Sequence, residues 1–254
     1  NKAGRAMIDT SLKRLLQRLR PDAGLVVLTG AGISRESGLH TFRDADGIWA
    51  QVRLEDVATP QAFARDPTRV QGFYNARRRA MLDPAIQPNA AHRALARLEK
   101  EWRGPFLLVT QNVDDLHDRA GSHKLLHMHG ELLKIRCAAC ERIDRFEGAL
   151  SSDAVCPGCG AQGTLRPHIV WFGEMPLHMD EIGEMLADAA LFVAIGTSGT
   201  VYPAAGFAAE ARAGGAVTLE VNMEETGGRF DGGLYGPATR TVPALVDFLL
   251  EEAR

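Results

Sequence analysis

The sequence predicts an α/β protein in which a mostly parallel sheet is covered by helices on both faces and a second, smaller domain is inserted. Two observations lead to this fold class. Short apolar runs, typical of buried strands, alternate with segments of helical period. Two long segments, Ile33 to about Pro88 and Glu131 to about Leu165, interrupt the alternation, and we interpret them as insertions that together form the smaller domain.

Each element follows in chain order. The predicted strands are Leu25–Thr29, Phe106–Thr110, Leu125–Met128, Leu191–Ile195 and Val217–Val221. The predicted helices are an amphipathic surface helix at Asn1–Arg20, Pro67–Leu82 in the first insertion, Asn89–Glu101, Met179–Ala189, Pro203–Ala213 and Val242–Glu252. Asn89 is the expected N-cap of its helix, because its side chain can accept a bond from the first turn.

The composition is ordinary for a globular protein: 254 residues, 45% hydrophobic and 24% charged, with a net charge of -3. This charge gives no reason to expect a nucleic acid partner. No apolar run reaches the roughly 20 residues that span a bilayer, and no apolar segment follows the charges of Asn1–Arg20 as in a signal peptide. We therefore expect a cytoplasmic protein without a membrane partner. Asn1 is not an initiator residue, so we also expect a truncated start.

Four cysteines form two C-x2-C pairs separated by fifteen residues: Cys137, Cys140, Cys156 and Cys159. This spacing is typical of a four-cysteine zinc site, and a cytoplasmic protein rarely keeps disulfides. The alternatives are two disulfides or four unrelated thiols. Since four protein ligands leave no open position for water, we expect a single structural zinc ion.

A glycine-rich turn follows the first predicted strand, at Gly30-Ala31-Gly32-Ile33-Ser34. A strand followed by Gly-x-Gly is typical of a turn that approaches a pyrophosphate; the alternative is a tight turn without a ligand. The full dinucleotide fingerprint is absent, because Arg35 stands where a third glycine is expected. A second loop, Gly196-Thr197-Ser198, also follows a strand, and Asn222 and Glu224 follow another. Ligands of open α/β sheets bind beyond such strand ends.

Polar side chains follow two further strands. Gln111-Asn112-Val113-Asp114 comes directly after Phe106–Thr110, and His129 follows Leu125–Met128. An imidazole with an ordinary pKa near 6.5 suits a general base at neutral pH, although a lone histidine is more often structural. His127, two residues away, is interpreted as structural.

These motifs occur together, with Thr41-Phe42-Arg43 and His129-Gly130, in the order found in sirtuins. From about Leu25 to Ala238 the chain resembles a bacterial sirtuin, an NAD-dependent protein-lysine deacylase. The resemblance implies a Rossmann-like large domain made of residues 1–34, 89–130 and 166–254. It also implies a small domain made of a helical module (35–88) and a zinc-ribbon module (131–165).

The resemblance further implies the residues that bind NAD. The segment from Gly30 to Trp49 would surround the pyrophosphate and the nicotinamide side, through Gly30, Ala31, Gly32, Ile33, Ser34, Phe42, Arg43 and Trp49. The nicotinamide ribose and carboxamide would be oriented by Gln111, Asn112, Val113 and Asp114. The adenosine end would be lined by Gly196, Thr197, Ser198, Asn222, Met223, Glu224 and Ala238.

For the reaction, the resemblance implies Asn112 and His129 as catalytic residues. The acyl-lysine oxygen would attack the nicotinamide ribose at C1′ and displace nicotinamide. His129 would then take a proton from a ribose hydroxyl, and the products would be free lysine and O-acyl-ADP-ribose. The substrate protein would bind as an extended peptide that adds a strand to Val170, Trp171, Phe172, Gly173 and Glu174. As an alternative, Val170–Phe172 is a buried strand only.

The acyl preference is predicted from a pair of side chains. Tyr74 and Arg77 are three residues apart in a helical segment and share one face. A guanidinium suits a carboxylate, but Arg77-Arg78-Arg79 also fits a solvated basic face. Sirtuins that accept succinyl- and malonyl-lysine have this Tyr-x-x-Arg pair and a small alanine, matched here by Ala58. The resemblance therefore implies desuccinylation and demalonylation beside deacetylation.

Two other functions share part of this pattern. The first is a hydride-transferring NAD dehydrogenase with a structural zinc, which lacks support because the third glycine and an acidic ribose partner are missing. The second is a zinc ribbon that binds nucleic acid, which the net charge of -3 disfavours.

Overall fold

The computed structural model describes residues 7–39 and 52–252. Its larger part is a six-stranded sheet in the order β3-β2-β1-β7-β8-β9, in which every neighbouring pair is parallel. The strands in this order are β3 (Leu125–His127), β2 (Phe106–Thr110), β1 (Leu25–Thr29), β7 (Leu191–Ile195), β8 (Val217–Asn222) and β9 (Gly232–Tyr235). Every residue of β1, β2 and β7 is buried, as expected for strands covered on both faces.

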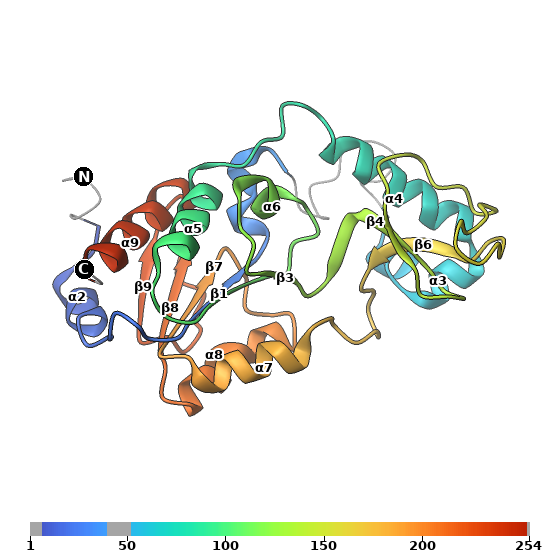
Figure 1. The fold of residues 1–254 in the computed structure, drawn as a ribbon. Helices are drawn as coiled ribbons and strands as arrows, with labels where there is room; N and C mark the ends of the chain where they lie inside the picture. The colour runs from blue at the N-terminus through green and yellow to red at the C-terminus, as the bar shows by residue number, and fades with distance from the viewer. Residues whose placement is uncertain (1–6, 40–51, 253–254) are drawn as a thin grey trace.

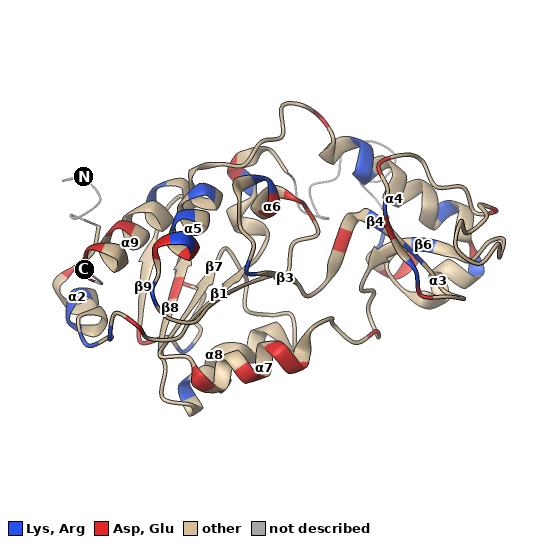
Figure 2. Ribbon diagram, in the orientation of Figure 1, with Lys and Arg blue, Asp and Glu red and all other residues tan. Residues whose placement is uncertain are grey.

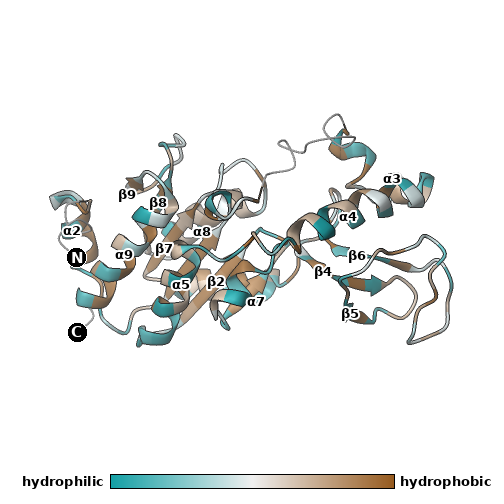
Figure 3. Cartoon of the chain, turned by 90° about the horizontal axis from the view of Figure 1, so that it is seen from above, coloured by the Kyte–Doolittle hydropathy of each residue, from teal (hydrophilic) through white to brown (hydrophobic). Residues whose placement is uncertain are grey.

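Helices cover both faces of this sheet (Figure 1). On one face lie α5 (Ala90–Glu101) and α9 (Ala238–Glu252), and on the other lie α7 (Met179–Asp188) and α8 (Phe207–Ala213). Side chains of β1 alternate between the two layers: Leu25 and Val27 pack with the first pair of helices, and Val26 and Leu28 with the second. Figure 3 shows the resulting pattern, with apolar strands inside and hydrophilic outer helix surfaces. The predicted α/β sheet covered on both faces is therefore confirmed.

The smaller part joins a helical module to a three-stranded antiparallel sheet in the order β5-β4-β6. Its helices are α3 (Pro60–Arg65) and α4 (Pro67–Met81), and its strands are β4 (Gly130–Cys137), β5 (Ile143–Arg145) and β6 (Leu165–Ile169). Phe73 of α4 shares a core with Leu132 and Ile169 of the sheet, so the two insertions pack as one unit. The predicted boundary at residue 165 falls on the first residue of β6, and the division into domains stays a prediction.

Short helices complete the described chain. They are α2 (Thr10–Leu16), α6 (Leu116–Ala120) and the 3₁₀ turns η1 (Ala31–Ile33), η2 (Arg35–Ser37), η5 (Leu54–Asp56) and η6 (Ala204–Gly206). The amphipathic helix predicted for Asn1–Arg20 is seen over Thr10–Leu16 and buries Leu12 and Leu16. Asn89 caps α5 as predicted, accepting from the amide of Ala91. Strand β9 was not predicted.

The described ranges contain no helix that is long and apolar enough to cross a membrane. Figure 2 shows acidic and basic residues together on α5, on α9 and over the small domain. Neither positive nor negative charge therefore dominates the described part of the chain. This distribution agrees with the small net charge of -3.

The interpretation of Arg77-Arg78-Arg79 as a solvated basic face is wrong for Arg78. Its side chain is fully buried, while Arg79 is exposed. The Arg78 guanidinium donates to the carbonyl of Leu132 at 3.1 Å and to that of Gly148 at 3.2 Å, and burial lowers its pKa to about 10. Arg78 therefore links α4 by hydrogen bonds to the segment that carries the cysteines.

The turn after β1 touches the turn after β7 through backbone atoms. The Gly32 amide donates to the Gly196 carbonyl at 2.8 Å. A Cβ atom at Gly32 would lie 2.6 Å from the Gly196 Cα, and one at Gly30 would lie 2.7 Å from the Gly196 oxygen. Because backbone atoms cannot move aside as a flexible side chain can, this contact requires glycine.

We expect Gly32→Ala to destabilise the protein by about 1–3 kcal/mol, because the new methyl group overpacks two backbone turns. The matched control is Gly183→Ala in α7, where the nearest atom to a new Cβ lies at 3.8 Å. This control should be neutral or gain up to about 1 kcal/mol, since alanine suits a helix interior better than glycine. Urea unfolding of both variants measures the two effects; equal stabilities would contradict the close contact.

Candidate active site

The loops after four neighbouring strands meet at the carboxyl edge of the large sheet. Gln111, after β2, donates from Nε2 to Thr197 Oγ1 at 3.1 Å. Asn222, at the end of β8, donates from Nδ2 to the Thr197 carbonyl at 2.8 Å. Thr197 itself follows Gly196 and so lies beside the Gly30–Gly32 turn. Loops that the sequence predicted separately are thus joined at one edge, where open α/β sheets bind nucleotides.

Asn112 and Ser34 lie at the centre of this edge. The Asn112 side chain donates to the Gly30 carbonyl at 2.9 Å and to Ser34 Oγ at 3.4 Å. Ser34 in turn donates to Asp114 Oδ2 at 2.9 Å, and Asp114 Oδ1 accepts from the Leu116 amide. The predicted residues Gly30, Ser34, Asn112 and Asp114 are therefore connected by hydrogen bonds.

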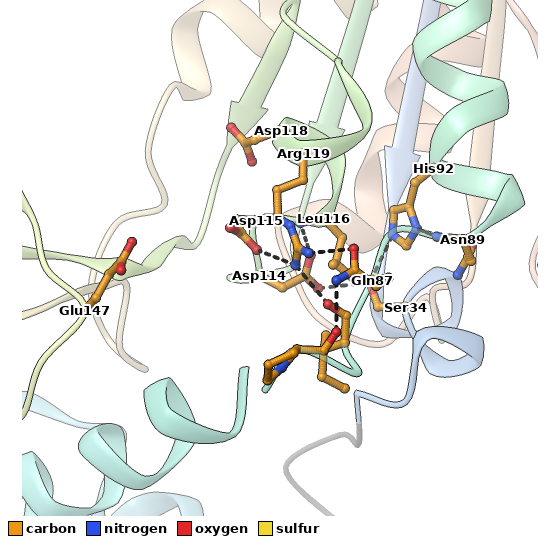
Figure 4. A network of polar contacts seen from close by, with 12 residues as sticks. Ser34, Gln87, Asn89, His92, Asp114, Asp115, Leu116, Asp118, Arg119 and Glu147 are labelled. Atoms are coloured by element: carbon orange, nitrogen blue, oxygen red, sulfur yellow. Dashed lines mark hydrogen bonds and ion pairs between the residues drawn. The ribbon is translucent and has the colours of Figure 1, made fainter. Parts of the chain in front are cut away.

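His92 of α5 joins Asn89 to Ser34 of this network, as Figure 4 shows. Its Nδ1 accepts from the Asn89 amide at 3.1 Å, so the ring proton must be on Nε2, which lies 3.3 Å from Ser34 Oγ. Burial, reinforced by Arg93, lowers the pKa of His92 to about 4, so the ring is neutral at pH 7. The neutral ring donates to Ser34, and this leaves the Ser34 hydrogen for Asp114. Burial also raises the pKa of Asp114.

A second group of bonds in Figure 4 ties α6 to the segment before α5. Arg119 donates to the Ile86 carbonyl at 3.0 Å and to Gln87 at 2.9 Å, and it lies 3.8 Å from Asp115. The end of the first insertion is thereby held against the helix that follows Asp114.

His129 lies between the large and the small sheet. Its Nδ1 is 3.2 Å from the Gln111 carbonyl. A carbonyl only accepts, so Nδ1 carries the proton and Nε2 is left as the basic nitrogen. Burial lowers the pKa of His129, although the bond to Gln111 opposes the shift. A half-buried neutral imidazole with its base nitrogen directed away from the backbone is suited to accept a proton at neutral pH.

His127 has a different environment. Its Nε2 lies 2.9 Å from Asp118 and 3.8 Å from Glu131, and Nδ1 lies 3.3 Å from the Asn112 carbonyl. Burial alone would lower its pKa, but the bond and the charge of Asp118, with that of Glu131, raise it. Lys134 also pairs with Glu131 at 2.6 Å, so this group is balanced by ion pairs. The interpretation of His127 as structural agrees with this arrangement.

The other predicted NAD residues are placed only in part by the described residues. Phe42, Arg43 and Trp49 lie outside the described residues. Met223 and Glu224 are exposed after β8. Among the rest, Ala31 and Ile33 form the η1 turn, Val113 accepts at its carbonyl from the Leu132 amide, Ser198 bonds Thr200, and Ala238 begins α9.

The candidate acyl-binding residues lie in the small domain. Tyr74 is 1% exposed and its hydroxyl accepts from Trp171 Nε1 at 2.9 Å. Burial raises the pKa of Tyr74 and lowers that of Arg77, so the phenol stays protonated and the guanidinium is largely withdrawn from water. Ala58 is buried in the same core as Tyr74. The bond from Trp171 uses an oxygen lone pair of Tyr74 and leaves the phenol hydrogen for another acceptor.

The predicted peptide-binding segment is not a strand, since β6 ends at Ile169. The amide of Val170 donates to the His129 carbonyl, that of Phe172 to the Ala58 carbonyl and that of Trp171 to Glu174. Glu174 also receives both terminal nitrogens of Arg166 at 2.8 Å. The alternative of a buried strand is wrong for Phe172, whose side chain is 57% exposed. The segment is a fixed loop that joins His129 to Ala58.

The four cysteines converge between β4 and β6. The sulfur atoms of Cys137 and Cys159 are 3.8 Å apart, as are those of Cys140 and Cys156, and all four sulfurs lie within 4.8 Å of one another. A tetrahedral zinc ion with Zn–S bonds of about 2.3 Å separates its sulfurs by about 3.8 Å, whereas a disulfide needs about 2.05 Å. All four thiols are free. The disulfide alternative is therefore wrong, and the donor set fits one structural zinc ion.

Sequence reasoning missed the residues beneath the site. His92 was visible only as part of the predicted start of α5, and nothing in its spacing indicated contact with Ser34. His117 and Thr29 are fully buried and bond each other at 2.9 Å across 88 residues of chain. A polar residue at the end of an apolar strand, as at Thr29 and Thr110, was the available signal.

The comparisons with known proteins agree with this geometry. The Sir2 family matches residues 30–203. The NAD-dependent protein deacylase SIR2rp3 of Trypanosoma brucei brucei (strain 927/4 GUTat10.1) is 56% identical over 235 residues, which is 91% of this chain and 96% of that relative. The NAD-dependent protein deacylase of Escherichia coli (strain K12) is 56% identical over 229 residues, 89% of this chain and 82% of that relative. A solved Sir2 homolog–NAD complex is similar with a TM-score of 0.85 and 37% identity over 97% of this chain and 96% of that one.

Fold and matched span together define an enzyme that uses NAD on a Rossmann-like sheet beside a zinc-ribbon module. The chain belongs to the Sir2 family. The resemblance to sirtuins, the fold class, the activity of an NAD-dependent protein deacylase, and the predicted NAD and zinc are thereby confirmed. Neither a hydride-transferring dehydrogenase nor a nucleic acid-binding zinc ribbon is supported by these relatives.

We expect one zinc ion per chain and expect Cys140→Ser to lose it. Metal binding contributes about 10 kcal/mol to folding in small zinc modules, and the buried core around the cysteines consists, in the described part of the chain, of five residues, two of them zinc ligands themselves. Hydrogen exchange of the Cys137 and Cys156 amides should then become fast, while β1 and β7 stay protected. Ala139→Ser, an exposed change in the same turn, is the matched control. Full zinc content in Cys140→Ser, measured by elemental analysis, would contradict the site.

Proposed function

We propose that this NAD-dependent deacylase acts on protein lysine and removes acetyl and also succinyl and malonyl groups. The products would be nicotinamide, O-acyl-ADP-ribose and free lysine. The observation that carries this proposal is His129, whose basic Nε2 is set by the bond of Nδ1 to Gln111, the first residue of the loop that holds Asn112 and Asp114. We also propose the cytoplasm as the place of action, because four cysteines grouped as a metal site are typical of a reducing compartment.

NAD would supply the ribose carbon that accepts the acyl oxygen, with nicotinamide as the leaving group. The protein's part is to hold reactants in place. The Gly30–Gly32 turn and the Gly196–Ser198 loop lie close together. The amides of Gly30, Gly32 and Gly196 already donate to backbone carbonyls, so the pyrophosphate would bind the amides of Ala31, Thr197 and Ser198. Asn112 keeps its amide nitrogen on the Gly30 carbonyl, so its oxygen remains for the ribose or carboxamide. Thr197 connects Gln111, proposed for the nicotinamide side, to Asn222, proposed for the adenosine side.

His129 would act as the general base. Its Nε2 would take the proton of a ribose hydroxyl, which makes that oxygen nucleophilic toward the acyl carbon. The Nδ1–H group of His129 keeps its hydrogen bond to the Gln111 carbonyl, so the ring keeps its orientation when Nε2 becomes protonated. Because burial lowers the pKa of His129, the base is already neutral at pH 7.

The acyl carboxylate of a succinyl- or malonyl-lysine would bind Arg77 and Tyr74. Arg77 is half-buried, and in such a place the attraction between a guanidinium and a carboxylate is screened less than on an open surface. Tyr74 keeps a hydrogen to donate, because its bond with Trp171 uses only the oxygen. Ala58 shares the core with Tyr74, and its small side chain would leave more room for the longer acyl chain than a larger side chain would.

The substrate peptide would bind in extended form along the loop from Val170 to Glu174. This loop is anchored by Trp171, which packs on Arg166 at 3.5 Å and bonds Tyr74. The amides of Val170, Trp171 and Phe172 already have acceptors, so a peptide would pair with other groups of the loop. Backbone pairing reads little sequence and would admit many protein substrates.

Activity should depend on the neutral form of His129. Since its pKa lies below the ordinary 6.5, kcat/KM should be level above pH 7 and should fall only below pH 6.5. His129→Ala should lose at least about 100-fold in kcat/KM, the usual contribution of a general base, whereas His123→Ala, an exposed histidine, should not. Nicotinamide release measured from pH 5 to 9 tests this; undiminished turnover in His129→Ala would refute the role.

Arg77→Met should separate the acyl substrates. We expect nicotinamide release with succinyl- and malonyl-lysine peptides to fall about 10- to 100-fold, the effect of losing a bond to a charged group, and release with acetyl-lysine to change little. Arg79→Met, two residues on and exposed, is the matched control. An equal loss on all three substrates would count against Arg77 as the selectivity residue. Absence of release from any peptide by the unmodified protein would contradict the deacylase itself.

A further inference from the structure

A second chain of buried hydrogen bonds lies beneath Asn112. Thr29 ends β1 and Thr110 ends β2, and the two residues face each other in the parallel register. Both are fully buried, and Thr29 Oγ1 donates to Thr110 Oγ1 at 2.8 Å. Thr110 Oγ1 also accepts from the backbone amide of Asn112 at 3.1 Å. The hydroxyl pair thus ends directly on the residue proposed to contact the reacting ribose.

His117 closes the other end of this chain. It is 1% exposed, and its Nε2 lies 2.9 Å from Thr29 Oγ1. The single hydroxyl hydrogen of Thr29 is directed to Thr110, so Nε2 of His117 must be the donor. The ring therefore carries its proton on Nε2, and Nδ1 has no partner among the described residues. Burial keeps the ring neutral by lowering its pKa well below the ordinary value.

This chain runs beside the one that starts at His92. The rings of His92 and His117 contact each other edge to face, with centroids 4.9 Å apart. His92 acts on the side chain of Asn112 through Ser34, while His117 acts on its backbone through Thr29 and Thr110. Asn112 is thereby held at two points by two neutral histidines.

A merely structural role does not explain His117 well. Burying an imidazole nitrogen without a partner costs stability, and an apolar side chain of similar size would avoid this cost. Only the directed bond from Nε2 to Thr29 requires a histidine here. In the absence of that bond, the hydroxyl of Thr29 could turn away from Thr110.

We propose that His117 and Thr29 are positioning residues that fix Asn112 through Thr110. The proposal rests on the function of Asn112 proposed above. Since the chain sets the direction of the Asn112 backbone and not the general shape of the NAD site, its loss should lower kcat and leave the KM for NAD nearly unchanged. The effect should follow the hydrogen bond and not the volume of the side chain.

The first test compares Thr29→Val, which keeps the shape without the hydroxyl, with Thr29→Ser, which keeps the hydroxyl. We expect Thr29→Val to lower kcat for nicotinamide release at least tenfold with less than a twofold change in KM for NAD. Thr29→Ser should retain kcat within threefold. Equal kcat values in the two variants, or a loss confined to KM, would overturn the proposal.

The second test removes the donor at the other end. His117→Phe keeps a ring without a donor, and His117→Gln places an amide nitrogen near the position of Nε2. We expect a tenfold loss of kcat in His117→Phe and substantial recovery in His117→Gln. These two variants test the positioning role even if Thr29→Val does not fold. Equal activity of His117→Phe and His117→Gln would contradict that role.

Nitrogen NMR of the unmodified protein gives a readout that needs no variant. The His117 ring should be neutral with its proton on Nε2 at pH 7, and a proton found on Nδ1 would overturn the proposed chain. If the unmodified protein releases no nicotinamide while His117 shows the expected proton, the proposed function fails and the hydrogen-bond chain does not. If it is active and the variants behave alike, only the positioning role fails.

Discussion

The backbone contact between the two glycine turns is the constraint on which the rest of the site depends. Gly32 and Gly196 approach so closely that neither turn can carry a side chain there, and one hydrogen bond joins them. This contact fixes Thr197 at the edge of the sheet, where it receives both Gln111 and Asn222. Loops that follow four different strands are therefore held side by side. Without these contacts, the conformational entropy of the loops would favour many other arrangements.

Beneath these loops the protein buries two histidine rings that stay neutral and one carboxyl group, that of Asp114. His92 and His117 both have pKa values lowered by burial, and the pKa of Asp114 is raised for the same reason. A buried donor without an acceptor lowers the stability of the fold, so each hydrogen bond here has a defined direction. The orientation of Ser34 and Asn112 then follows from which nitrogen of each histidine carries the proton.

Particular residues show what the sequence could predict and why the rest needed three dimensions. The strands β1, β2 and β7 are continuous apolar runs, and their predicted bounds agree with the structure because both faces are buried. Strand β9 begins with two glycines and has no such run. Arg78 and Arg79 are chemically identical neighbours, and only the contacts with Leu132 and Gly148 bury the first. Spacing along a chain does not contain that information.

One stretch of chain carries both His129 and the first zinc ligands, and the topology explains this. Strand β3 of the large sheet ends at His127 and β4 of the small sheet begins at Gly130, so His129 lies where the chain crosses between them. Gly130 has a φ of 88°, and a Cβ there would lie 2.1 Å from the His168 carbonyl, so the crossing is tight. The His129 carbonyl in turn receives the Val170 amide. Zinc would join the end of β4 at Cys137 to the loop before β6 that carries Cys156 and Cys159, and would so stabilise this module without taking part in the chemistry of His129.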